Sequence, residues 1–263
     1  MRAASVHRSL VLALFVATST GVLLAQGGHW DWPEKAMNLK VLPEDTSPDR
    51  LRATMRGFTG ALGVRCTYCH VGEEGKPLST FDFVSDKNPN KDRAREMMRM
   101  LGSIEGHLKR IEPSGTERVG VRCQTCHQGR ARPTTLEEEL LAAYRKDGRK
   151  AIGTRYTELR ERYYGGGGLD FGEHSLNNLG YQLLESSAPE DLETAIAVLQ
   201  LNTEQYPKSG NAWDSLAEAY AKAGRSEIAA IYYRKSVEVD PRNEHALQEL
   251  RALAAGEAKS GGE

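Results

Sequence analysis

The stretch GVRCTYCHVG (residues 63–72) and its near repeat GVRCQTCHQG (residues 120–129) decide how this chain is organised. Each contains the pattern Cys-x-x-Cys-His, and together they hold all four cysteines of the 263 residues. Paired cysteines of this kind belong to disulfides, to zinc sites or to covalently attached haem. The residues concerned are Cys66, Cys69 and His70 in the first motif, and Cys123, Cys126 and His127 in the second.

Covalent haem is the chemistry that explains the two histidines. Disulfides are common in exported proteins, and two cysteine pairs could supply four thiolates to zinc. Zinc-binding pairs usually lie about 15–20 residues apart, whereas 53 residues separate Cys69 from Cys123. In C-x-x-C-H the two thiols form thioethers with haem and the adjacent histidine binds its iron. We therefore expect two covalently bound haem c groups with His70 and His127 as iron ligands, and we keep disulfides and zinc as alternatives.

A methionine-bearing helix is predicted before each motif. The first covers residues 47–63, with Ser47 as its N-cap and an apolar stripe that includes Met55. The second runs from about residue 90 to residue 111, and its stripe includes Met97 and Met100. Methionines on such a stripe usually fill a core, but beside a haem they can close the second axial position of the iron. An iron with two protein ligands transfers electrons, whereas an open iron binds small molecules.

Residues 36–133, through the stretches MNLKVLPEDTSPDRLRATMRGFTGALGVRCTYCHVGE and FVSDKNPNKDRAREMMRMLGSIEGHLKRI, resemble the cytochrome c subunit of photosynthetic reaction centres. That family builds each haem site from a helix with an axial methionine, a turn and a C-x-x-C-H motif. The resemblance implies that Met55 and Met97 are axial ligands, with Met100 as the alternative to Met97. Met98 lies off the stripe, and His107 is expected to be solvated rather than bound to iron.

The chain departs from that family in its number of haem motifs. The family typically carries four haems, and this chain has two C-x-x-C-H motifs. Ile111 stands where the family's second helix offers a histidine to the fourth haem. The resemblance implies electron transfer to a reaction centre or another membrane redox complex. We expect an electron carrier rather than an enzyme, with a dihaem peroxidase or reductase as the alternative.

The bulk composition and the N-terminus indicate a soluble exported protein. The chain is 39% apolar and 27% charged, and no basic run is dense enough to suggest nucleic acid. A basic start and an apolar run ending at Ala25 predict a signal peptide over residues 1–25. Export to the periplasm follows, with a retained membrane anchor as the alternative. The expected partners are redox proteins, with no small-molecule substrate, and Arg130 and Arg132 are expected to be solvated.

The C-terminal half predicts short α-hairpins. Residues 134–168 are expected to form a helical linker that ends at the break GGGG (residues 165–168). Residues 169–256 carry the pattern of tetratricopeptide repeats. Residues 257–263 are expected to form a disordered tail. The array is interpreted as a protein-docking surface, with a stabilising appendage as the alternative. The signature residues are Trp213, Leu216, Ala217, Tyr220, Gly224, Ala229, Tyr233 and Pro241. The expected fold is mostly α: a dihaem domain over residues 26–133 followed by this array.

Overall fold

The computed structural model describes residues 30–111 and 120–260. This part of the chain is mostly helical and has no strand, which confirms the expected fold class. The predicted signal peptide (residues 1–25) lies outside the described residues. The helices are α1 (Pro48–Leu62), α2 (Pro89–Leu108), α3 (Cys123–His127), α4 (Leu136–Asp147), α5 (Lys150–Tyr163), α6 (Glu173–Leu184), α7 (Pro189–Gln205), α8 (Gly210–Lys222), α9 (Ser226–Val239) and α10 (Glu244–Ser260), with the 3-10 helices η1 (Cys66–Tyr68) and η2 (Leu78–Thr80).

Helix α1 begins and ends where its sequence indicates. The Ser47 hydroxyl accepts a hydrogen bond from the backbone N–H of Arg50, and Pro48 occupies the first turn. Gly63 ends the helix in the left-handed conformation, at φ 64°. Helix α2 also begins with a proline, but it ends at Leu108, three residues before the predicted end. The local signals therefore position α1 directly before the first motif, whereas residues 109–122 separate α2 from the second motif.

The hydrophobic core lies almost entirely in α4–α10, which we call the helical module. Leu140 of α4, Tyr156 of α5 and Leu179 of α6 are each 2% exposed or less. All three belong to one buried cluster that continues through the later helices. The prediction of a linker over residues 134–168 with a flexible break at residues 165–168 is therefore wrong. Helices α4 and α5 need the apolar face of α6 to cover their own, and so they belong to the same core.

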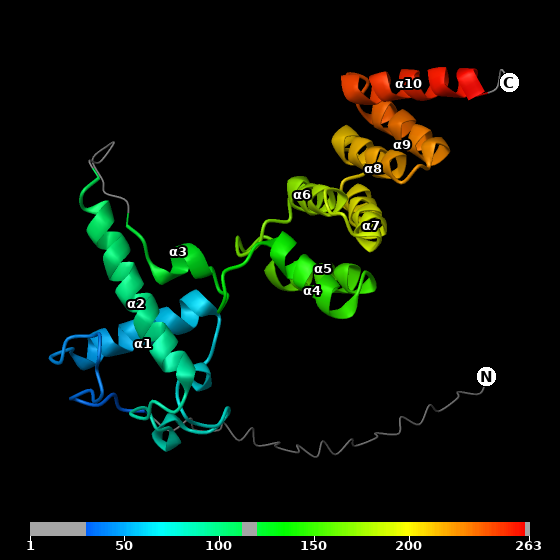
Figure 1. The fold of residues 1–263 in the computed structure, drawn as a ribbon. Coiled ribbons are helices and arrows are strands. Elements are labelled where there is room, and N and C mark those ends of the chain that lie inside the picture. Colours follow the sequence, from blue (N-terminus) through cyan, green and yellow to red (C-terminus); the bar gives the residue numbers. More distant parts are fainter. Residues whose placement is uncertain (1–29, 112–119, 261–263) are drawn as a thin grey trace, which may run out of the picture.

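The helical module is a row of helix pairs. Figure 1 shows α4–α5, α6–α7 and α8–α9 following one another, with α10 at the end. Leu216, Ala217 and Tyr233 of the predicted repeat signature are buried in the interior of the row. Helix α10 reaches Ser260, so it continues through the start of the predicted tail.

The N-terminal part (residues 30–133) has almost no apolar core of its own. Among its described residues, Leu51 and Ala61 are the buried apolar side chains. Figure 1 shows α1, α2 and α3 standing apart from the helical module, and α1 packs against α3. A segment of about 100 residues usually buries a larger apolar core of its own, so a bound apolar cofactor could supply what these residues lack.

Candidate haem site

The first motif closes into one turn directly after α1. The carbonyl of Cys66 accepts from the backbone N–H of Cys69 at 3.2 Å and from that of His70 at 2.9 Å. Helix η1 therefore presents two thiols and one imidazole around a single turn. All four cysteines of the chain are free thiols, and Cys66 and Cys69 are half-buried. The pattern Cys-x-x-Cys-His thus folds locally in the way that attachment of a flat cofactor requires.

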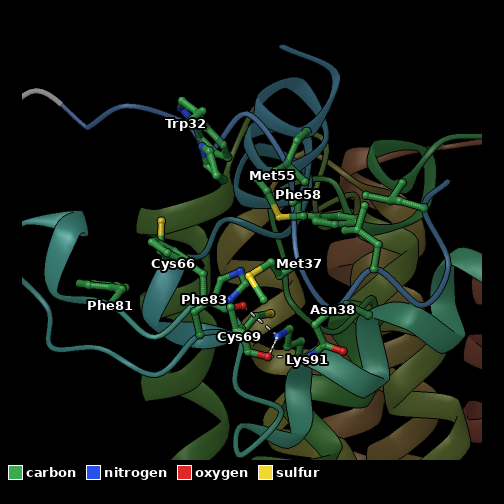
Figure 2. A pocket seen from close by; sticks show the side chains of 18 of the residues that line it. Trp32, Met37, Asn38, Met55, Phe58, Cys66, Cys69, Phe81, Phe83 and Lys91 are labelled. Atoms are coloured by element: carbon green, nitrogen blue, oxygen red, sulfur yellow. Dashed lines mark hydrogen bonds between the residues drawn. The ribbon is translucent and has the colours of Figure 1, made fainter. Parts of the chain in front are cut away.

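The first motif faces a cavity of about 670 Å³. Figure 2 shows Met55 and Phe58 of α1 on one side of it, and Cys69, Phe83 and Lys91 on the other. The cavity is lined mainly by apolar and aromatic groups, and its size is that of a site for a cofactor-sized molecule. The ring of Phe83 lies edge-on to the ring of His70, with centroids 5.0 Å apart. An apolar cavity bounded by two thiols, an imidazole and a thioether fits haem c.

The His70 ring is partly buried beside the cavity, next to two cationic side chains. Its Nδ1 is buried and has no hydrogen-bond partner among the described residues. Burial, and then the positive charges of Lys91 and Arg95, lower the pKa of this imidazole below its ordinary value. Neutral imidazole is the form that binds a metal. Burial also raises the pKa of the Cys69 thiol, with the neighbouring Cys66 adding to the effect.

Asp86 links residues 38–40 to helix α2 beside the cavity. Its carboxylate accepts from Lys40 Nζ at 2.6 Å and from Asn38 Nδ2 at 2.9 Å, and it pairs with Arg95 of α2 at 2.9 Å. These contacts, Lys40 first, hold the pKa of Asp86 well below its ordinary value. The Lys91 ammonium also reaches Asp86, at 3.2 Å, so three cations converge on one acid. The cluster ties residues 38–40 to α2 and closes one wall of the cavity.

The second motif forms α3, whose histidine has a defined tautomer. His127 is 8% exposed, and its Nδ1 lies 2.8 Å from the carbonyl oxygen of Arg130. Because a carbonyl oxygen only accepts, Nδ1 carries the proton of this bond, and Nε2 is the ring nitrogen that could bind a metal. Cys123 is half-buried and Cys126 is exposed. The second motif therefore also places two thiols and one imidazole on a single helical turn.

Helix α2 presents methionines on two different faces. Met98 lines the first cavity together with Ala94 and Arg95, although its position off the predicted stripe gave no reason to expect this. Met97 and Met100, the expected ligand and its alternative, are 41% and 48% exposed and do not line that cavity. These two methionines thus lie on a face of α2 that the described residues leave partly uncovered. The structure thus separates Met98 from the other two.

The two motifs are joined backbone to backbone. The N–H of Gly129, after the second motif, donates to the carbonyl of Ala61 at the end of α1, at 2.8 Å. A Cβ on Gly63, before the first motif, would lie 2.1 Å from the carbonyl oxygen of Gly129. Gly63 therefore allows a contact that a side chain at this position would prevent. This contact fixes the first and second turns relative to each other.

Sequence reasoning missed several residues that shape the site. Phe83 of the loop before α2 and Lys91 of α2 lie near His70, but an isolated aromatic or basic residue carries no recognisable signal. Arg130 was expected to be solvated, and this prediction is wrong, because the residue is 6% exposed. The Arg-Ala-Arg sequence gave no means of telling Arg130 from the exposed Arg132. Tertiary contacts alone distinguish them.

A helix, a turn and C-x-x-C-H beside an apolar cavity define the haem segment of a c-type cytochrome. Residues 33–150 match the family model of the photosynthetic reaction centre cytochrome c subunit. This match confirms the resemblance drawn from the sequence, and that family consists of multihaem c-type cytochromes. The matched residues extend beyond the motifs into α4.

Two curated proteins show the same similarity over a limited length. The chain is 30% identical to cytochrome c-554 of Chloroflexus aurantiacus over 121 residues, which cover 46% of this chain and 26% of that protein. It is 34% identical to the photosynthetic reaction center cytochrome c subunit of Rubrivivax gelatinosus over 111 residues, which cover 35% of this chain and 28% of that protein. The chain thus spans about a quarter of the length of these relatives.

Proposed function

We propose that this chain is a dihaem c-type cytochrome that carries electrons between protein partners. The observation that carries the proposal is the first cavity, which brings Met55, His70 and both thiols of the first motif to one apolar space. The small apolar core of residues 30–133 supports it independently, since a large apolar cofactor would supply the missing core. The repeated motif supports a second haem.

Each predicted site residue has a role in this proposal. Cys66 and Cys69 attach the first haem, and Cys123 and Cys126 attach the second. His70 and His127 are the proximal ligands, and Met55 and Met97 the axial ligands on the opposite faces. Haem held in this way supplies a one-electron carrier, and its potential depends on the axial ligands and on burial. The protein's part is to fix the ligands and to keep water from the iron.

The proposed partners are redox proteins, one of them a membrane redox complex of the reaction-centre kind. The similarity to the Rubrivivax protein, a cytochrome c subunit of the photosynthetic reaction center, supports this choice. We also propose export to the periplasm by the signal peptide over residues 1–25. Within residues 30–111 and 120–260, no helix is long and apolar enough to cross a membrane.

The helical module is proposed as the docking surface, with the repeat pattern as its basis. Residues 170–263 carry 16 acidic and 8 basic side chains, an excess of 8 negative charges. Residues 26–133 carry 18 basic and 14 acidic side chains, an excess of 4 positive charges. A basic partner surface would therefore be attracted to the later part of the module, α6–α10. The alternative is a module that only stabilises the cytochrome part.

The first experiment is the absorption spectrum of the full chain, made with its leader in a host that attaches haem c. Haem is counted against protein in the same sample. The proposal expects two haems per chain, both low-spin, with the weak far-red band of methionine on ferric iron. A high-spin spectrum would contradict it and support the peroxidase or reductase alternative, which needs an open iron.

The second experiment tests the first axial ligand with a matched pair of variants. Met55→Ala is expected to lower the potential of one haem and to open its iron to added ligands, because methionine ligation raises the potential. Met98→Ala removes a methionine from the same cavity and serves as the control. An unchanged potential in Met55→Ala, or a larger change in Met98→Ala, would remove Met55 from its role.

A further inference from the structure

A charged side chain is buried directly behind the second motif. Arg130 is 6% exposed, yet it follows His127 by only three residues in a short loop. Burying a charge costs several kcal/mol unless partners compensate it. The buried Arg130 side chain must therefore be compensated by specific partners.

The Arg130 guanidinium contacts the loop before α4, helices α4 and α5, and the loop between α5 and α6. It donates to the backbone carbonyl of Thr134 at 2.6 Å and to that of Gly168 at 3.0 Å. It also donates to Glu139 Oε1 at 3.0 Å and to the hydroxyl of Thr134. Its carbon lies over the ring of Tyr163, 5.6 Å from the centroid. A planar fork with this many donors suits such an arrangement, and a lysine could not reproduce it.

Glu139 extends the contact into the core of the helical module. Its other oxygen accepts from Arg155 of α5 at 2.6 Å, so one carboxylate joins two guanidinium groups. Gly168 lies so close that a Cβ there would sit 3.0 Å from the carbonyl oxygen of Gln128. The glycine run (residues 165–168) thus packs closely against the loop after α3. Three segments of the module converge on one side chain.

The same residue holds the second histidine through its backbone. The carbonyl of Arg130 accepts the Nδ1 proton of His127 at 2.8 Å, while the Nδ1 of His70 in the first motif has no hydrogen-bond partner among residues 30–111 and 120–260. A hydrogen bond at the ring nitrogen that does not bind the metal orients a ligating imidazole and strengthens it as an electron donor to the metal. The strength of this bond depends on where the Arg130 backbone lies. The guanidinium contacts fix that position.

We propose that Arg130 is a positioning residue for His127, through which the helical module sets the potential of the second haem. This inference rests on the proposed function. The contacts run from Arg155 to Glu139, from Glu139 to Arg130, and from the Arg130 carbonyl to the His127 imidazole. Among the described residues His70 has no corresponding hydrogen bond at Nδ1, so the two haems should respond differently to changes in the module.

The test is a redox titration of haem-loaded full chain, with Arg130→Lys compared with Arg132→Lys. Both variants keep the charge, but Arg132 is exposed and Arg130 is buried. The component that belongs to the second motif is identified by its loss in a Cys123→Ala, Cys126→Ala variant. Arg130→Lys is expected to raise the potential of that component and to leave the other unchanged. Arg132→Lys is expected to move neither.

A second variant keeps the test decisive where Arg130→Lys does not fold. Glu139→Gln leaves the loop sequence intact, removes the central carboxylate, and is expected to shift the same component in the same direction by a smaller amount. Unchanged potentials in the folded variants, or equal shifts in Arg132→Lys, would overturn the inference while two low-spin haems still support the proposed function. Wild-type protein without haem at the second motif would overturn both.

Discussion

Replacing Gly63 by alanine tests the contact that joins the two motifs. Gly63 ends α1 at φ 64°, a conformation that disfavours residues with a Cβ. The added Cβ would also lie 2.1 Å from the carbonyl oxygen of Gly129, so the backbone of one turn must move. Both effects act on the folded protein and both are unfavourable. We therefore expect a large loss of stability from the addition of one methyl group.

The size of the loss follows from these two effects. A left-handed conformation costs a non-glycine residue about 1–2 kcal/mol. Forcing an extra carbon into a packed site costs about 1–3 kcal/mol. The free energy of unfolding should therefore fall by about 2–5 kcal/mol, which is a large part of the 5–15 kcal/mol that is usual for a whole domain.

The assay is urea unfolding of the haem-loaded protein, followed by haem absorbance and by circular dichroism. Gly60→Ala is the matched control, because it lies in the same helix and a Cβ there would meet nothing within 4 Å. That control should stabilise the protein by about 0.5–1 kcal/mol. A loss below 1 kcal/mol in Gly63→Ala, or equal effects in both variants, would refute the contact between the motifs.

Two further predictions concern the helical module. Leu140→Ala removes a side chain of α4 that is 0% exposed, and it should lower the unfolding free energy by about 2–5 kcal/mol in a urea titration. A linker helix outside the core would lose far less. Burial raises the pKa of Glu139, but hydrogen bonds from Arg155 and Thr134 outweigh it and lower the pKa below 4.5. The stability that this carboxylate contributes, facing Arg155 and Arg130, is therefore present above pH 4.5 and is lost as the pH falls below it. Wild type and Glu139→Gln should differ in unfolding free energy above pH 4.5 and converge at lower pH; a constant difference would contradict the ion pair.

Features set by neighbours in the sequence could be predicted from it. Ser47, Pro48 and Gly63 fix the ends of α1 through contacts with the adjacent turn, and the structure has them in those roles. Cys66 and His70 share a turn because the motif is only five residues long. The family resemblance rests on the same local patterns, and the match over residues 33–150 confirms it. The iron ligands themselves remain predictions.

Features set by distant parts of the chain could not be predicted in this way. Arg130 is buried because Gly168 and Glu139, far along the chain, approach it, whereas Arg132 is left exposed. Met98 lines the first cavity because the folded chain places one face of α2 along the same cavity as α1.

The sequence by itself determined the repeated motif, the helix before each copy and the helical character of the second half, because each depends on residues within a few positions of one another. Only the tertiary structure decided that α4 and α5 share the core of the later helices, that the glycine run seats the loop of the second motif, and which arginine is buried. These outcomes depend on which surfaces meet once the helices pack, and the energy of burying a group is set by all the segments that surround it.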